Sequence, residues 1–140
     1  MREHRHLGAY GLITNGTKIL LIKKSRGAYT GKLDLPGGSF EHGETPKECV
    51  SREIIEETGL KVKQVKLYDA ISCNVQWLDG NEMEDLHHIG IIYKVEVEDD
   101  KNIKEDADGL DSLGAVWHEI KDLNKEDVSP FVFQMISSFN

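Results

Sequence analysis

The segment GSFEHGETPKECVSREIIEETGL, residues 38–60, constrains the fold of this chain more than any other stretch. Glycines at its start allow tight turns of the backbone. Thr45 then suits the N-cap of a helix, Pro46 suits the first helical position, and Glu48 completes a capping box. The sequence therefore predicts a loop that leads into a helix over residues 46–58, which ends at the glycine that follows.

The predicted helix carries three glutamates on one face. Glu53, Glu56 and Glu57 are spaced i, i+3 and i+4, so their side chains fall within one arc. Like charges at this spacing repel each other by about 0.2 to 0.5 kcal/mol per pair, so a compensating interaction is needed. Two interpretations stay open: a solvated acidic face, or an oxygen-ligand site for Mg²⁺ or its substitute Mn²⁺. Arg52, beside the first glutamate, is placed to hold a carboxylate.

The amino-terminal segment predicts a pair of strands. Residues 7–14 and 17–24 are apolar, and Asn15-Gly16 between them is a strong signal for an antiparallel hairpin. Because both runs are apolar nearly throughout, we expect burial on both faces and a central place in a sheet.

A second hairpin is expected after the helix. Residues 61–75 alternate between polar and apolar side chains, residues 86–98 do so at their carboxyl end, and the polar stretch 78–85 separates them as a turn region. His87 and His88 are adjacent on the second strand and point to opposite faces, so we expect one to line a cleft and the other to face solvent.

The carboxyl-terminal part predicts a short strand over residues 114–120 and a final helix that begins at Ser129-Pro130. Phe131, Met135 and Phe139 repeat at helical spacing and are expected to pack in the core. This alternation of strands and helices predicts an α/β fold with a sheet that is at least partly antiparallel. Nothing marks a second domain, so residues 1–140 are expected to form one domain.

Charge and cysteine content narrow the class of protein. The net charge of −8 disfavours binding to long nucleic acid or to an anionic membrane surface. The first twelve residues lack the apolar core of a signal peptide, and no run reaches membrane-spanning length. Cys49 and Cys73 have no CxxC spacing, which favours reduced thiols and a cytoplasmic location. The oligomeric state stays open, with a homodimer among the options.

Within residues 38–60, certain residue types recur at set spacings, and this pattern resembles the Nudix box at every defined position. The pattern begins with a glycine, has a glutamate after five residues, and after seven more continues as Arg52-Glu53-Ile54-x-Glu56-Glu57-x-Gly59-Leu60. Leu35-Pro36-Gly37-Gly38 is similar to the lead-in that usually precedes the box. The chain is therefore identified as a member of the MutT-like Nudix hydrolase family.

The resemblance implies a fold and a reaction. The fold is a mixed β-sheet sandwiched between α-helices. The reaction is Mg²⁺-dependent hydrolysis of the pyrophosphate linkage in a nucleoside diphosphate joined to another group. The expected partner is a small nucleotide: a nucleoside triphosphate or its oxidised form, a dinucleoside polyphosphate, or a nucleoside diphosphate sugar. The alternative is a non-catalytic nucleotide sensor on the same fold, although such relatives usually have a degraded box.

The resemblance also implies roles by position. Three carboxylates and one backbone carbonyl correspond to the metal ligands of the family: Glu53, Glu56, Glu57 and Gly37. Arg52 and Glu44 are expected to orient this cluster, and Glu53 is also the candidate general base. The alternative base is an acidic residue of the loop over residues 99–112, where the candidates are Glu105, Asp106 and Asp108.

Three further residues are candidate substrate contacts. Arg26 and Lys32 belong to a loop over residues 25–33 that directly precedes the box, where they would contact a phosphate or a sugar; alternatively, both are solvated. Trp77 is placed to stack on a base, which is worth about 1 to 3 kcal/mol, or to cover the end of a strand.

Overall fold

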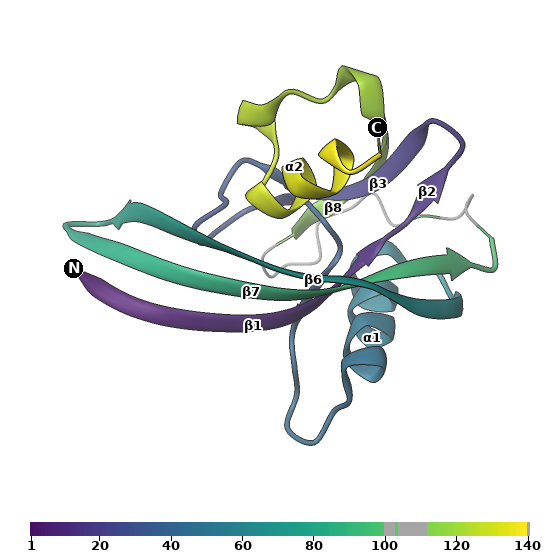
Figure 1. The fold of residues 1–140 in the computed structure, drawn as a ribbon, viewed down its shortest axis with the longest axis horizontal. Coiled ribbons are helices and arrows are strands. Elements are labelled where there is room, and N and C mark those ends of the chain that lie inside the picture. Colours follow the sequence, from purple (N-terminus) through teal and green to yellow (C-terminus); the bar gives the residue numbers. More distant parts are fainter. Residues whose placement is uncertain (100–102, 104–111, 140) are drawn as a thin grey trace.

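The structure is a computed structural model that describes residues 1–99, 103 and 112–139. Strands, two α-helices and two short 3₁₀-helices follow one another along the described chain (Figure 1). In order they are β1 (Arg2–Leu12), β2 (Thr14–Asn15), β3 (Lys18–Lys24), β4 (Leu33–Asp34), β5 (Gly37–Ser39), α1 (Pro46–Thr58), β6 (Val62–Asp79), β7 (Glu82–Val97), β8 (Ser112–Glu119), η1 (Ile120–Asp122), η2 (Lys125–Asp127) and α2 (Pro130–Ser137).

The strands form two sheets between the helices. The first sheet has the order β5-β1-β7-β6, and it is mixed because β1 pairs with β7 in parallel and with β5 antiparallel. In the second sheet, β3 pairs antiparallel with β8 along its length and with β2 and β4 near its two ends. Figure 1 shows α1 on one side of the β1, β7 and β6 band and α2 on the other. The predicted α/β class, with a mixed sheet between helices, is confirmed.

The first predicted hairpin is correct at its turn and wrong in its extent. Asn15 pairs with Lys18, and Gly16 has a φ of 61°, which glycine adopts without strain. The first strand of the hairpin is nevertheless only β2, because the chain leaves one sheet for the other at Ile13. Residues 7–12 instead pair with β5 and β7. A buried strand needs hydrogen-bond partners along both of its edges. Here β5 and β7, which are distant in the sequence, provide them.

The second hairpin is longer than predicted. β6 continues to Asp79 and β7 begins at Glu82, so the turn consists of Gly80-Asn81 alone rather than residues 78–85. Gly80 has a φ of 65°, as the first central residue of a type II′ turn requires. Glu84, one of the polar residues near this turn, is buried within strand β7. Its carboxylate accepts hydrogen bonds from Arg2 and His4 of β1, which compensates for the burial of its charge.

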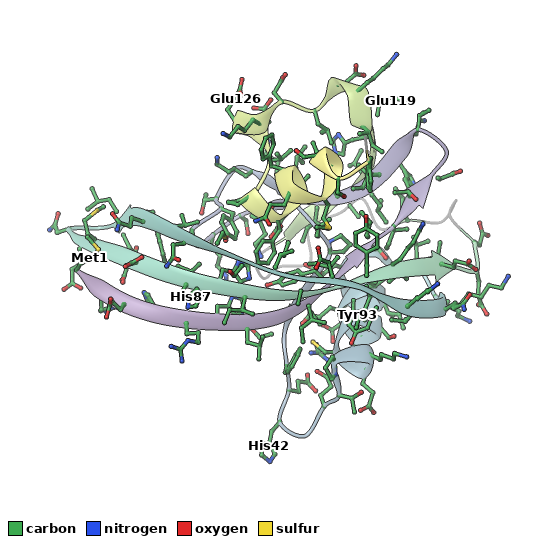
Figure 2. The ribbon with its side chains drawn as sticks, in the orientation of Figure 1. Met1, His42, His87, Tyr93, Glu119 and Glu126 are labelled. Carbon is green, nitrogen blue, oxygen red and sulfur yellow. The ribbon has the colours of Figure 1, made fainter. Side chains whose placement is uncertain are left out.

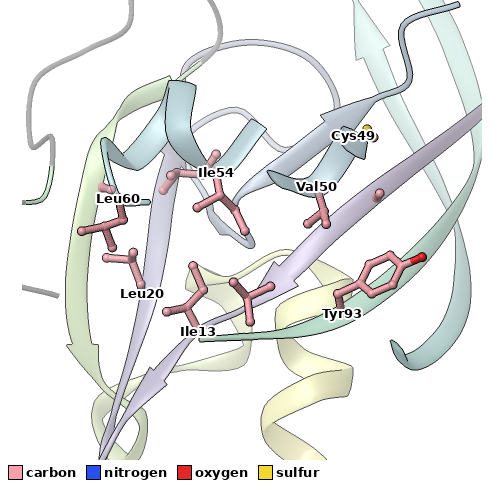
Figure 3. Packing of buried hydrophobic residues seen from close by; sticks show 11 residues of the cluster. Ile13, Leu20, Cys49, Val50, Ile54, Leu60 and Tyr93 are labelled. Carbon is pink, nitrogen blue, oxygen red and sulfur yellow. The ribbon is translucent and has the colours of Figure 1, made fainter. Parts of the chain in front are cut away.

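Two apolar clusters lie on opposite faces of the sheets. Leu20 and Ile22 of β3 pack with Val50 and Ile54 of α1, in the cluster that Figure 3 shows. The alternate residues of β3 pack in the other cluster with α2. All four apolar residues from position 19 to position 22 are 0% exposed, which confirms the prediction that this strand is buried on both faces.

The final helix begins at Pro130 as predicted, and the Ser129 hydroxyl accepts a hydrogen bond from the Val132 N–H. Phe131 and Met135 lie in the core, but Phe139 is 40% exposed because α2 ends at Ser137. The expectation that Phe139 packs in the core is therefore wrong. No helix in the described ranges combines the length and the apolar character needed to cross a membrane.

Candidate active site

Helix α1 sets the positions of the three glutamates, and its ends are those predicted from the sequence. The Thr45 hydroxyl accepts from the Glu48 N–H at 3.2 Å, and the Glu48 carboxylate accepts from the Thr45 N–H at 3.0 Å, so the capping box is present. Gly59 ends the helix with a φ of 76° and donates to the Ile55 carbonyl. The helix therefore begins and ends at fixed residues, which fixes the face on which the glutamates lie. Figure 2 shows His42 at the tip of the loop that precedes it.

Glu57 joins the helix to strand β5. Its side chain is buried, and Oε1 accepts a hydrogen bond from the Gly37 N–H at 2.7 Å. Gly37 has a φ of 147°, and a Cβ there would clash with the backbone of Ala9 and Tyr10 on β1. A glycine is thus required at position 37, where it brings β5 close to both β1 and α1.

Gly38 leaves room for a second carboxylate. A Cβ on Gly38 would lie 3.0 Å from Cδ, Oε1 and Oε2 of Glu53, which is tighter than ordinary van der Waals contact. The missing side chain therefore forms a cradle for the Glu53 carboxylate against β5.

Arg52 connects the acidic groups to one another and to β5. Nε and Nη2 donate to the two oxygens of Glu44 at 2.7 and 2.9 Å, which is a bidentate pair. Nη1 donates to Glu53 at 2.9 Å and to Glu56 at 3.3 Å. Nη2 also donates to the Ser39 carbonyl at 3.1 Å. The Arg52 guanidinium lowers the pKa of Glu44 to about 2, so Glu44 stays ionised and holds the guanidinium in this position.

The three glutamates line one cleft with a volume of about 1080 Å³. Gly37 and Gly38 of β5 line it too, as does Arg26 from the loop after β3. Of the other predicted site residues, Arg52 and Glu44 are not among those that line the cleft. Arg52 hydrogen-bonds to Glu53 and Glu56, and Glu44 hydrogen-bonds to Arg52.

Lys32 and Trp77 are not among the residues that line this cleft. The half-buried Trp77 ring stacks on His4, with ring centroids 6.0 Å apart and an angle of 18° between the planes. The alternative candidates for the base, Glu105, Asp106 and Asp108, fall outside the described residues.

The donor set at the cleft fits a hard divalent cation. It consists of three carboxylates and the backbone of a glycine-rich strand, and Mg²⁺ prefers oxygen ligands of this kind. In the part of the chain that the structure describes, no three His, Cys, Asp or Glu side chains already converge in the geometry of a metal site. Arg52 instead hydrogen-bonds to Glu53 and Glu56, and the cradle at Gly38 accommodates the Glu53 carboxylate.

Three buried polar residues meet at this cleft, and two of them, Tyr10 and Tyr29, had no predicted part in a site. Tyr10 of β1, Tyr29 and His88 all line the cleft, and His88 lies within hydrogen-bond distance of both tyrosines. Of the two adjacent histidines, His88 therefore lines this cleft, while His87 on the opposite face is half-buried rather than fully in solvent. The signal that was available is Tyr10 itself, a polar aromatic residue within the apolar run 7–14.

A comparison with known protein families identifies the chain. A sequence model described as the NUDIX domain matches residues 4–139, which is nearly the whole chain. The chain belongs to the Nudix family. The glutamate-bearing helix and the glycine strand described above are thus the Nudix box in its folded form.

Named relatives and solved structures agree with this assignment. Over 64 residues, this Nudix chain is 48% identical to the ADP-ribose pyrophosphatase of Methanocaldococcus jannaschii, a match that covers 44% of the chain and 38% of that protein. Over 65 residues it is 35% identical to the 8-oxo-dGTP diphosphatase of Escherichia coli, covering 45% of the chain and 50% of that protein. The matched region thus spans half or less of each relative. A crystal structure of a MutT NUDIX hydrolase from Burkholderia pseudomallei has the same fold, with a TM-score of 0.74, 23% identity, and coverage of 98% and 99% of the two chains.

Proposed function

We propose that this protein is a divalent-metal-dependent hydrolase that cleaves the pyrophosphate linkage of a nucleoside diphosphate joined to another group. The observation that carries the proposal is the cleft in which Glu53, Glu56 and Glu57 meet the glycines of β5. Membership of the Nudix family and the names of the two relatives support the same reaction class.

The carboxylates of the cleft have distinct parts in this proposal. Glu53, Glu56 and Glu57 would hold Mg²⁺, or Mn²⁺ in its place, together with the Gly37 carbonyl. The ion would supply neutralisation of phosphate charge and activation of a water. Arg52 restrains Glu53 and Glu56, because its guanidinium is itself fixed by the bidentate pair with Glu44. Phosphoryl transfer needs mainly such positioning and charge stabilisation from the protein.

The remaining groups bind substrate and move a proton. Arg26 lines the cleft and is our candidate for a phosphate contact, and Lys32 and Trp77 stay candidates for the outer parts of the substrate. A carboxylate oxygen of Glu53 takes a proton from the attacking water. The water oxygen bonds to a phosphorus of the pyrophosphate as the bridging P–O bond breaks, which gives a nucleotide and a second phosphorylated product.

We propose a substrate from one of three classes: a nucleoside triphosphate or its oxidised form, a dinucleoside polyphosphate, or a sugar-linked nucleoside diphosphate such as ADP-ribose. The two relatives, an ADP-ribose pyrophosphatase and an 8-oxo-dGTP diphosphatase, are named for substrates in two of these classes. We propose that the enzyme works in the cytoplasm on free nucleotides, since Cys49 and Cys73 are free thiols and the net charge is −8.

The test is turnover of a panel of these nucleotides with Mg²⁺ or with a chelator, in ¹⁸O-labelled water, with products identified by phosphorus NMR. The expected result is metal-dependent release of a nucleotide from one class, with the label on the attacked phosphorus. Glu56→Gln and Glu57→Gln should lose activity, whereas the matched control Glu126→Gln, an exposed glutamate on η2, should not. Saturable nucleotide binding without turnover under any metal would contradict the proposal and identify a sensor.

A further inference from the structure

Three buried side chains that line the cleft, and a half-buried cysteine next to them, form a chain of hydrogen-bonding groups that the proposed hydrolysis does not use. His88 of β7 is 1% exposed, its Nε2 lies 2.6 Å from Tyr10 Oη, and its Nδ1 lies 2.7 Å from Tyr29 Oη. Tyr29 Oη is also 3.3 Å from Cys73 Sγ on β6. We call Tyr10, His88, Tyr29 and Cys73 the His88 relay. Three of its members line the same cleft as the glutamates of α1.

His88 is neutral in this environment. Its ring stacks on His6 with centroids 4.8 Å apart and on Phe131 with centroids 4.3 Å apart. Burial, with the nearby His6 and Lys24, lowers the pKa of His88 to about 3. A neutral imidazole has one N–H donor and one acceptor nitrogen. One tyrosine must therefore donate to His88 while the other accepts, and the accepting tyrosine keeps its own O–H for a different acceptor.

The position of the imidazole proton decides which tyrosine this is. With the proton on Nδ1, Tyr29 accepts and its O–H is directed to Cys73, which keeps the relay internal. With the proton on Nε2, Tyr10 accepts, and its O–H is left to donate. Across the described residues, Tyr10 Oη makes no other hydrogen bond than that to His88. Its proton is then available to an acceptor on a molecule bound in the cleft.

Tyr10 is held where such a proton would meet a substrate. A Cβ on Gly8 would lie 2.6 Å from Tyr10 Oη and 2.8 Å from the Gly38 carbonyl oxygen, so the hydroxyl lies beside Gly8, near the glycine strand that borders the glutamates. The rings beside Tyr10 are those of the neutral His88, with centroids 5.4 Å apart, and of Phe131, with centroids 5.5 Å apart. These uncharged rings offer no counter-charge to a phosphate, so the Tyr10 hydroxyl suits an uncharged acceptor better than an anionic one.

We propose that His88 is a positioning residue that carries its proton on Nε2 in the substrate complex, so that Tyr10 donates a hydrogen bond to an uncharged oxygen or nitrogen of the nucleoside part of the substrate. This inference rests on the proposed function for the presence of a nucleotide. It adds a specificity contact from β1 in the cleft that the carboxylates of α1 also line.

The first test is the tautomer of His88 in the bound protein. Long-range proton–nitrogen NMR of ¹⁵N-histidine-labelled protein distinguishes the two tautomers. A His88→Gln variant identifies the His88 signals among those of the six histidines. The spectrum is recorded with saturating nucleoside monophosphate. This compound is a product of the proposed reaction, so the enzyme does not consume it during the measurement. A proton on Nε2 in the complex is expected. A proton on Nδ1 would overturn the proposal.

The second test is binding affinity, measured by calorimetry. Tyr10→Phe should weaken nucleoside monophosphate binding by about 3- to 10-fold, the scale of one neutral hydrogen bond. It should leave the binding of inorganic pyrophosphate with Mg²⁺ unchanged. Tyr68→Phe is the matched control, because Tyr68 is exposed on β6 and bonds only to Ser138 in the described structure. Unchanged monophosphate binding, or an equal loss for pyrophosphate, would refute the contact.

Two further comparisons locate the effect. If ribose 5-phosphate binding falls as much as monophosphate binding in Tyr10→Phe, the acceptor is on the ribose; if only monophosphate binding falls, it is on the base. His88→Leu should match the loss in Tyr10→Phe, and the double variant should be no weaker than either single one, while His88→Gln restores part of the affinity. Additive losses would show that His88 does not act through Tyr10.

These measurements use binding alone, so they stay informative if hydrolysis is absent. The proposed function fails when metal-dependent turnover is missing in the wild type. The proposal for the His88 relay fails if the protein binds the nucleotide but His88 carries its proton on Nδ1. It also fails if Tyr10→Phe does not selectively weaken nucleoside monophosphate binding.

Discussion

Replacement of Glu57 separates its contribution to folding from its contribution to the proposed metal site. The Glu57 side chain is 3% exposed, and its Oε1 accepts the Gly37 N–H at 2.7 Å. Glu57→Gln keeps an oxygen acceptor on a side chain of the same length but removes the charge. Glu57→Ala removes both, which leaves the buried Gly37 N–H without an acceptor.

The two variants should therefore differ in stability and agree in activity. An unsatisfied buried N–H costs about 1 to 3 kcal/mol, so Glu57→Ala should lose at least about 2 kcal/mol once the lost side-chain contacts are included. Glu57→Gln should stay within about 1 kcal/mol of the wild type, because the hydrogen bond is kept and the repulsion among the glutamates is relieved. In both variants kcat should fall by at least about 10²-fold, the scale on which loss of a positioned charge is felt.

Urea unfolding and Mg²⁺-dependent turnover measure the two effects on the same preparations, with Glu126→Gln as the control. Activity of Glu57→Gln within a few-fold of wild type would refute the assignment of this carboxylate to the metal site. Equal stability of the alanine and glutamine variants would instead show that the bond to Gly37 contributes nothing to folding.

Three other perturbations follow from the structure. Gly38→Ala places a Cβ 3.0 Å from the Glu53 carboxylate, so turnover should fall by about 10-fold at an unchanged unfolding midpoint; full activity would show that the position of Glu53 is not critical. Gly90→Ala directs a methyl group into the Phe131 ring and should cost about 1 to 3 kcal/mol in urea unfolding, whereas wild-type stability would mean that the ring moves freely. Because the pKa of His88 is about 3 in the folded state and about 6.5 in the unfolded chain, the unfolded chain binds the extra proton between these values. Wild-type stability should therefore fall as the pH is lowered through that window, and His88→Gln should show a shallower fall; parallel curves would contradict the burial argument.

The locally encoded parts of the molecule could be predicted from the sequence. Helix α1 has the predicted bounds because its cap, its first proline and its terminal glycine lie within the helix or next to it. The shared face of Glu53, Glu56 and Glu57 follows from helical spacing alone.

Features that depend on distant segments were not predictable in this way. Strand β1 pairs in parallel with β7, so that Tyr10 lies opposite Ile92, and no local pattern in residues 7–14 indicates that partner. The contact between Tyr10 and His88 joins residues 78 positions apart, and it forms only because this pairing places both side chains on one face of the sheet. Trp77 stacks on His4 for the same reason, since β7 lies between their strands.

The central claim is that the glutamates of α1 form a divalent metal site, and Mn²⁺ binding followed by electron paramagnetic resonance tests it most directly. The wild type and Glu126→Gln should bind Mn²⁺ saturably and with equal affinity, and excess Mg²⁺ should displace it. Glu56→Gln and Glu57→Gln should each bind at least about 10-fold more weakly while remaining folded. Equal Mn²⁺ affinity in all four proteins would contradict the account, because the carboxylates would then be no more than an acidic face.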